Sequence, residues 1–301
     1  MKHFLPGLLL FVALLPAHAQ EDPLYAQYLN NPLVINPAYS GLNRSFNAAV
    51  TYRRQWGGFD GAPSTGSLTA HTALADNKMG AGLVFVRDKS GNTNNTEALA
   101  TYAYRISGGG RTLSFGLQGG FINYKIMNSE LNPYDPADPA FASNQSITRP
   151  SVGAGLIFSS ERFFLGLSAP RLLKAEDTSG DVTARLYSQH YYFMGAYVFH
   201  LNERVRFKPS VLFKGVKGAP FSTDYNAAIN LDERYTAALF TRNFNTYGFL
   251  AQIRLGDLYR LGYAFEVPTN SSVGTRFTTH EFSFGVNLAF LKSHETTVTN
   301  F

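Results

Sequence analysis

The 301-residue sequence contains no cysteine. A disulfide framework, a thiol nucleophile, a thiolate metal site and a lipoprotein anchor are therefore excluded. Charged residues make up only 16% of the chain, against roughly 25% in an average soluble domain. Beyond residue 19, no apolar run approaches the roughly 20 residues that a membrane-spanning helix needs. The chain is thus poor in charge for a soluble protein, and it lacks the signature of a helical membrane protein.

Aromatic residues, in contrast, are abundant. The sequence has 25 Phe and 17 Tyr beside a single Trp. The net charge of +5 raises the question of nucleic acid, but the basic residues are scattered, with no run beyond Arg53 and Arg54. Scattered basic residues more often face solvent or a polar lumen. Nucleic acid is therefore not predicted as a partner.

The first 19 residues have the order of a secretory signal peptide. Lys2 supplies the positive charge, residues 8–15 form an apolar core, and Ala17 and Ala19 flank His18 in a small-x-small cleavage pattern. A buried N-terminal helix, the alternative, does not explain this order. We therefore expect residues 1–19 to be removed near Gln20 and the mature protein to be exported.

The rest of the chain alternates with a period of two. In "TLSFGLQGGF" (residues 112–121), large apolar residues share one face, and Ser, Gly and Gln share the other. Such alternation predicts strands with one apolar face, each long enough to cross a bilayer when tilted. Fourteen strands are expected, at residues 44–54, 64–74, 79–88, 95–106, 111–124, 150–159, 162–169, 186–200, 203–214, 222–231, 234–243, 246–255, 258–267 and 278–290.

The connections between these strands sort by length. Every second one is tight, as in "ADNK" and "SGGG", and those between are usually longer, notably residues 125–149 and 170–185. Short periplasmic turns and longer extracellular loops are typical of outer-membrane barrels. The fold class predicted is all-β, a transmembrane antiparallel β-barrel of about 14 strands at residues 44–291, followed by a tail at 292–301. A soluble β-sandwich is the alternative, and Pro209, inside a predicted strand, argues for a bulge or a later strand start.

Several stretches together resemble one family. They are "NPLVINPAYSG" (31–41), "YRRQW" (52–56), "RFFLGLSAPRLL" (162–173), "FKPSVLFKGVKGAP" (207–220), "DLYRLGYAFE" (257–266) and "THEFSFGVNL" (279–288). In this order they resemble the PorP/SprF family of type IX secretion outer-membrane proteins. The Asn-Pro-Ala collar is shared by other outer-membrane barrels, and it becomes specific when joined to "YRRQW". Thr279 departs slightly from the family's Ser-His-Glu.

The resemblance implies a non-enzymatic barrel of the type IX secretion and gliding machinery, in the outer membrane of a Gram-negative bacterium. Its implied partners are a large secreted surface protein with a type IX C-terminal domain, periplasmic ring and peptidoglycan-binding components, and outer-membrane lipids. The alternative is a transport barrel for hydrophobic small molecules. A transporter should have a lateral opening or an apolar lumen pocket, whereas an anchor should have a plugged lumen and a protein-binding mouth.

Two regions are candidate sites at which a partner protein binds. The collar, residues 20–43, is rich in Pro and Tyr, and its prolines make it rigid because their φ angles are preset. It is expected at the periplasmic mouth or in the lumen as a plug. The loop at residues 125–149 holds aromatic residues between prolines, which limits the entropy lost on docking. The partner-binding candidates are Asn36, Pro37, Tyr39, Gly41, Arg53, Arg54, Trp56, Tyr134, Asp135 and Phe141.

A search for chemistry finds no catalytic, cofactor or metal site. Ser168 in "GLSAP" lies in a strand that ends at a proline, and His280 and Glu281 alternate to opposite faces of a strand. Asn132, Asp135 and Asp138 offer oxygen atoms, but their spacing matches no calcium loop. The inward charged residues are expected to pair with one another or with polar lumen groups. They are Arg53, Arg105, Arg254, Arg260 and Glu266.

Overall fold

The computed structural model describes residues 26, 28, 31–130, 143–179, 182–216, 220–269 and 275–288. The predicted signal peptide with its cleavage site, the predicted tail at 292–301, and the candidates Tyr134, Asp135 and Phe141 lie outside these residues. So do Asn132 and Asp138. No helix in the described ranges is long and apolar enough to cross a membrane.

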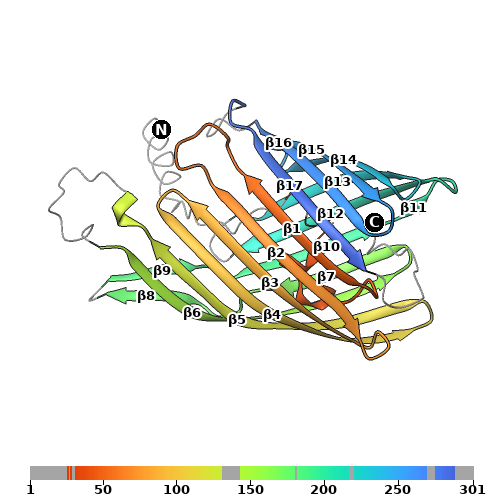
Figure 1. Cartoon of the computed structure of the whole chain (residues 1–301), viewed down its shortest axis with the longest axis horizontal. Helices are drawn as coiled ribbons and strands as arrows, with labels where there is room; N and C mark the ends of the chain where they lie inside the picture. Colours follow the sequence, from red (N-terminus) through yellow and green to blue (C-terminus); the bar gives the residue numbers. More distant parts are fainter. Residues whose placement is uncertain are drawn as a thin grey trace, which may run out of the picture.

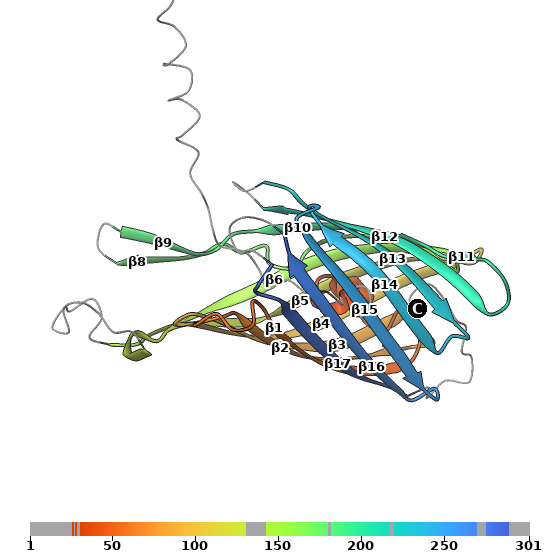
Figure 2. The same cartoon turned by 90° about the horizontal axis from the view of Figure 1, so that it is seen from above.

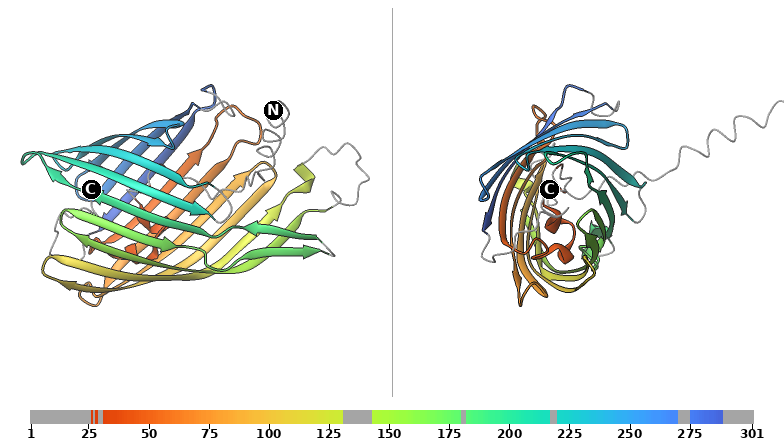
Figure 3. Two further views of the ribbon diagram at one scale, coloured as in Figure 1. Left: turned by 180° about the vertical axis from the view of Figure 1, so that it is seen from behind. Right: turned by 90° about the vertical axis from the view of Figure 1, so that its right-hand side faces the viewer.

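The described residues form an antiparallel β-barrel (Figures 1 and 3). Its sheet has 15 strands, of which β11 (Phe199–His200) is a two-residue extension along β12, so fourteen strands form the wall. The predicted fold class is confirmed. These strands are β1 (Phe46–Arg54), β2 (Ser64–Leu74), β3 (Met79–Ser90), β4 (Thr93–Gly108), β5 (Arg111–Ile126), β6 (Gln145–Ser160), β7 (Phe163–Ala169), β10 (His190–Tyr197), β12 (Val205–Val216), β13 (Ser222–Leu231), β14 (Tyr235–Arg242), β15 (Thr246–Leu255), β16 (Tyr259–Pro268) and β17 (Thr279–Leu288).

Two pairings close the sheet on itself. The first strand pairs with the last over its whole length, from Phe46 opposite Leu288 to Arg54 opposite His280. On the other side β10 pairs with β12, with Met194 opposite Leu212. Closure leaves no sheet edge in the hydrocarbon region, where an unpaired backbone group would cost several kcal/mol.

The two faces of the wall divide as the alternation predicts. On β5, Leu117 and Phe121 are more than 60% exposed on the outside, whereas Ser114 and Gln118 are buried on the lumen side. On β17, Phe282 and Phe284 face outward and Glu281 faces the lumen. The outer apolar side chains meet lipid, and the lumen receives the small and polar residues.

The ends of the barrel differ, with tight turns on the periplasmic side. At one of these turns the Arg204 guanidinium donates to Asp232 at 2.6 Å, and this hydrogen bond lowers the pKa of the Asp232 carboxyl.

Several predictions for the extracellular loops need correction. The predicted loop "KSGNTNN" is a two-residue turn at Gly91 and Asn92, because β3 and β4 continue as a hairpin beyond the membrane. The loops predicted at residues 125–149 and 170–185 need corrections of the same kind.

The loop predicted at residues 125–149 is shorter, because β5 extends to Ile126 and β6 begins at Gln145, with a short 3-10 helix η4 (Asn128–Glu130) between them. The loop predicted at 170–185 contains a hairpin of β8 (Ala175–Ser179) and β9 (Val182–Tyr187), so β10 begins at His190 rather than at residue 186. In this region Ile122 and Tyr124 of β5 are buried on the inner face with Ala175 and Tyr187, so outward apolar alternation no longer marks the strand.

Pro209 lies inside β12, which begins at Val205, so neither predicted explanation holds. The β12 ladder to β13 runs through Pro209, which is opposite Ala227. On the other side, the pairing stops at Ala196 opposite Ser210 and resumes at Phe199 opposite Phe207. Pro209, which has no N–H to donate, therefore lies where the pairing with the neighbouring strand is interrupted. The register is the same on both sides of this gap, and there is no bulge.

The two faces of β17 provide a direct test of the barrel. Phe284 is 43% exposed on the outside, and its neighbour Ser283 faces the lumen opposite Gly262. Arginine at a lipid-facing midplane position costs about 2–4 kcal/mol. We therefore expect Phe284→Arg to impair folding more than Ser283→Arg, measured by heat-modifiable migration on gels. The reverse order would contradict the register of the last strand.

Candidate functional site

Residues 31–45, here called the plug segment, run inside the barrel. Figure 2 and the right-hand view of Figure 3 show this segment enclosed by the strands. Leu33, Ala38 and Ser40 are completely inaccessible to solvent. The segment leads directly into β1 at Phe46, so the plug and the first strand are continuous.

The sequence of the plug segment explains its shape. It forms two short 3-10 helices, η2 (Pro32–Val34) and η3 (Pro37–Tyr39), each with a proline as its first residue. Proline presets its own φ angle and lacks an N–H that would need a partner there. The Asn36 side chain accepts a hydrogen bond from the Ala38 N–H at 3.0 Å and so caps η3. Gly41 then takes a positive φ of 67°.

Side chains of the wall hold the backbone of the plug. Ser168 and Ser114 each donate to a plug carbonyl at 2.7 Å, that of Ile35 and that of Ala38 respectively. Arg105 donates to the Ser40 carbonyl at 2.6 Å. These donors come from β7, β5 and β4, so three strands hold one segment.

Further hydrogen bonds tie the plug to the barrel. The Asn36 amide donates to the carbonyls of Leu156 and Leu167, at 3.3 and 3.2 Å. The Gly41 N–H donates to His71 Nδ1 at 3.0 Å, so this nitrogen carries no proton. Buried polar groups cost free energy unless they are paired, so these bonds specify one position for the plug.

Apolar packing fills the space around the plug. Leu33, Ile35 and Tyr39 belong to one buried cluster with wall residues that point inward, among them Val84 and Ile157. The Tyr39 ring also packs edge-on against His71, with ring centroids 5.4 Å apart. Without the plug, water in the lumen would contact these apolar wall residues. The plug supplies the apolar partner that these wall residues need.

Glycines in the wall allow the plug to approach the strands to van der Waals contact. A Cβ at Gly116 would lie 2.0 Å from the Ala38 nitrogen, and one at Gly80 would lie 1.9 Å from the Ser40 carbonyl oxygen. A Cβ at Gly155 would meet the Asn36 Oδ1 at 2.0 Å. No side chain fits at these three positions while the plug is in place. These inward glycines are therefore part of the site.

A network of charges lies on the opposite wall of the lumen. Arg53 of β1 forms two hydrogen bonds of 2.8 Å to the Glu266 carboxylate and a third of 3.1 Å to Glu281. Arg242 is paired with Asp224 in the same way, at 2.9 to 3.1 Å. All five groups are buried. A bidentate guanidinium–carboxylate geometry of this kind fixes both side chains.

The charge network reaches the chain upstream of the plug segment. The Ala26 N–H donates to Glu281 at 2.7 Å. Of the inward charged residues predicted to pair with one another or with polar lumen groups, Arg53 pairs with Glu266, and Arg105 donates to backbone carbonyls of Asn77 and Ser40. Within the described ranges, no group of three or more His, Asp or Glu is placed to hold a metal ion. The lumen-facing residues bind and position a peptide segment of the same chain, and the charges of the network are already paired with one another.

The predicted binding residues fall into two environments. Asn36, Pro37, Tyr39 and Gly41 are buried in the plug, and Arg53 is buried in the charge network. A partner could reach these residues only if the plug left the lumen. Arg54 is exposed on the outside at the extracellular end of β1, and Trp56 is half-buried in the following loop with a φ of 52°. Their role in binding stays a prediction.

The wall residues that hold the plug were not predicted as site residues. They include Ser114, Ser168 and Thr101, and Glu281 bonds in the same way to Ala26 upstream of the plug. Alternation assigns each of them to the lumen face. It does not indicate which inward residue meets which part of the plug, because that depends on the register across six or more strands.

Solved structures of other proteins are similar to this chain. Similar solved structures include the outer membrane protein Omp33 of Acinetobacter baumannii, with 8% identity over 83% of this chain and 100% of that chain and a TM-score of 0.48. The CymD monoaromatic hydrocarbon channel has 7% identity over 91% and 94%, with a TM-score of 0.49. The toluene transporter TbuX of Ralstonia pickettii has 6% identity over 85% and 92%, with a TM-score of 0.48.

A search of curated proteins finds no significant match. In contrast, the family described as type IX secretion system membrane protein PorP/SprF matches residues 17–286. This match covers the plug segment and the fourteen strands apart from the last two residues of β17. The chain therefore belongs to the PorP/SprF family of type IX secretion system membrane proteins.

Proposed function

We propose that this protein is a non-enzymatic, plugged barrel of the type IX secretion machinery that anchors or assists the export of a large surface protein. The observation that carries the proposal is the filled lumen. The plug segment occupies the space between β4, β5, β6 and β7, and it is held there by hydrogen bonds and by apolar packing. A barrel closed in this way acts through its surfaces.

The same observation speaks against transport of hydrophobic small molecules. Such a transporter needs an apolar cavity that a ligand can enter from the lumen. In the described part of the chain, one cluster of inward apolar residues is covered by Leu33, Ile35 and Tyr39 of the plug. Two others pack against Ala26 and against the β8–β9 hairpin. The extracellular ends of β5 and β6 and the β8–β9 hairpin, in contrast, project beyond the other strands of the barrel (Figure 1). They offer the area that a protein partner needs.

Photo-crosslinking from native outer membrane tests the proposal. A crosslinker at Trp56 samples the extracellular mouth, and one at Glu203 samples a periplasmic turn. We expect Trp56 to capture a secreted protein with a type IX C-terminal domain and Glu203 to capture periplasmic ring or peptidoglycan-binding components. Capture of neither class from either end would contradict the proposed role.

The extracellular loop provides a second test of the same role. Replacing residues 131–142 with a short Gly/Ser linker should leave the barrel inserted while reducing surface retention of the secreted partner. A companion variant, Tyr134→Ser with Phe141→Ser, keeps the length of the loop and removes its aromatic anchors. Partner retention is measured on whole cells against the amount of folded barrel. Normal retention in both variants would place the contact elsewhere.

A further inference from the structure

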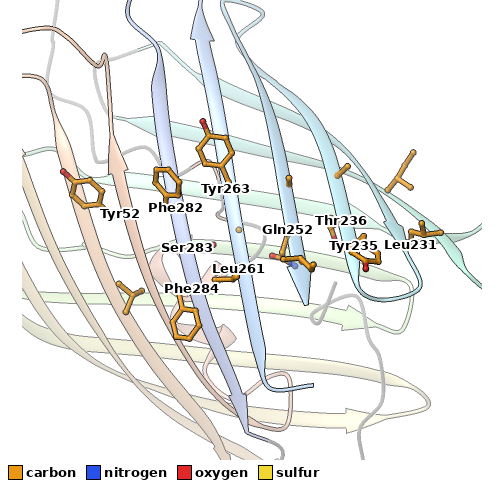
Figure 4. A pocket seen from close by; sticks show the side chains of 16 residues that line it. Tyr52, Leu231, Tyr235, Thr236, Gln252, Leu261, Tyr263, Phe282, Ser283 and Phe284 are labelled. Atoms are coloured by element: carbon orange, nitrogen blue, oxygen red, sulfur yellow. The ribbon is translucent and has the colours of Figure 1, made fainter. Parts of the chain in front are cut away.

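The outer surface of the barrel has an apolar hollow. It has a volume of about 960 Å³ and is lined from β1, β13, β14, β15, β16 and β17. Figure 4 shows its side chains spread across neighbouring strands, from Tyr52 and Phe282 to Tyr235 and Leu231. We call it the outer trough. It is separate from the lumen, because its lining side chains, such as Phe284 and Leu261, are exposed on the outside.

The register of the strands explains the hollow. Ala237 and Ala251 are direct neighbours on β14 and β15, and both face outward. The row on one side of this alanine pair holds Leu239 opposite Phe249, and the row on the other side holds Tyr235 opposite Ile253. Two small residues between two rows of large ones leave a depression. A barrel wall is otherwise convex toward lipid.

The trough lies in the part of the wall that faces the bilayer, so water does not fill it. An empty space would forfeit the dispersion contacts of every atom around it. Lipid chains or an apolar protein surface must therefore occupy the trough. The charges at its extracellular end distinguish between these two occupants.

That end of the trough is basic. Arg54 is exposed on the same face of β1 as Tyr52, two residues or about 7 Å away along the strand. Arg276, in the loop four residues before His280, the partner of Arg54 in the register, is also exposed. Within the described ranges, neither guanidinium is paired with a carboxylate. A cationic end joined to an apolar trough is complementary to a lipid that carries a negative headgroup.

Aromatic residues mark the level of the headgroups. The Tyr263 hydroxyl is 2.8 Å from His280 Nδ1, and His280 is opposite Arg54 in the register. Tyr263 and Phe282 pack at a centroid distance of 4.9 Å just below. Tyrosines with a polar partner are typical of the membrane interface. The basic residues therefore lie at the depth of lipid phosphates in the outer leaflet, with the trough extending toward the membrane interior.

We propose that the outer trough, with Arg54 and Arg276, binds a phosphate-bearing, multiply acylated lipid of the outer leaflet. The acyl chains fill the space over Ala237 and Ala251, and the phosphate is bound by the two guanidinium groups. A guanidinium binds phosphate in a bidentate manner, which makes arginine well suited to this end of the site. The site lies outside the lumen, so it is independent of the plug.

The test uses the purified full chain in detergent micelles with diphosphoryl lipid A as the probe, and native mass spectrometry gives the apparent Kd. Removing charge with Arg54→Gln and Arg276→Gln should raise the Kd about fivefold for each arginine. Filling the trough with Ala251→Phe should raise it on the order of tenfold. Ala237→Leu is a milder second variant, and heat-modifiable migration identifies the variants that fold.

Matched controls lie on the other side of the barrel. Ala100→Phe enlarges an outward alanine on β4, and Lys125→Gln removes an exposed cation at the extracellular end of β5. Both should leave the Kd within about twofold, inside the effect expected for one charge. A dephosphorylated probe should bind more weakly, and inorganic phosphate should not compete.

Four results would overturn the proposal. They are a wild-type Kd in all folded trough and arginine variants, equal affinity for the dephosphorylated probe, displacement of the probe by inorganic phosphate, and an effect of only one of the two classes of variant. An effect of the arginines alone would indicate a free anion site. An effect of the trough alone would indicate binding of acyl chains without recognition of the phosphate.

Discussion

Gly116→Val should release the plug while the barrel stays folded. The new side chain points into the lumen from β5, where even its Cβ would lie 2.0 Å from the Ala38 nitrogen. Overpacking of this kind typically costs 1–3 kcal/mol, and more where the neighbour is backbone. Each 1.4 kcal/mol shifts the equilibrium between seated and displaced plug about tenfold. We therefore expect a large rise in the displaced population and a higher conductance in planar bilayers.

The absence of native cysteine makes this measurement direct. Ser40→Cys places one thiol at a fully buried plug position, and its labelling rate by a membrane-impermeant maleimide reports exposure of the plug. The control is Gly119→Val on the same strand, where the nearest neighbour of a new Cβ is 4.0 Å away on the outer side. Equal labelling rates in the two glycine variants would show that the wall does not determine the position of the plug.

Arg53→Met should be the most destabilising single change in the charge network. Arg53 is 1% exposed and is the shared partner of Glu266 and Glu281. Removing one partner of a buried ion pair costs about 3–5 kcal/mol, because the remaining charge is left uncompensated. Arg242 is 3.6 Å from Glu266 and relieves only part of this cost. Urea unfolding of the barrel in lipid vesicles measures the loss of stability.

Two further variants make the measurement specific. Arg54→Met alters the next residue, which is exposed on the outside, and should change the free energy of unfolding by less than about 0.5 kcal/mol. Adding Glu266→Gln and Glu281→Gln to Arg53→Met removes the stranded carboxylates and should restore part of the stability. If the triple variant were no more stable than Arg53→Met, the loss would come from packing rather than from uncompensated charge.

The wall of the barrel was predictable because the bilayer imposes one rule on every strand. Lipid selects apolar residues such as Leu117 and Phe121 at alternate positions, so the sequence carries a regular pattern wherever the strand crosses the membrane. The pattern stops where the strand leaves the membrane. The ends of β5 and β6 and the hairpin of β8 and β9 were missed for that reason.

The interior was predictable only in part. Residues such as Ser114, Gly116 and Glu281 could be assigned to the lumen, but their partners come from the plug or from distant strands. The contact of Gly116 with Ala38 depends on how a non-periodic segment folds inside a closed wall. Neither periodicity nor composition encodes that position. The prolines and Asn36 indicated a rigid turn, while the choice between the periplasmic mouth and the lumen required the three-dimensional structure.

The pairing of β1 with β17 has a consequence for the way the barrel forms. Phe46 meets Leu288, so the wall cannot close before the last strand of the chain has been delivered. Pairings so distant in sequence make folding slow, since much chain entropy is lost before the contacts form. The plug segment, joined to β1, is present from the beginning, and its apolar face can gather β4 to β7 around it. It would then act as an internal template for assembly, and weakening its contacts would slow insertion even where the finished barrel is equally stable.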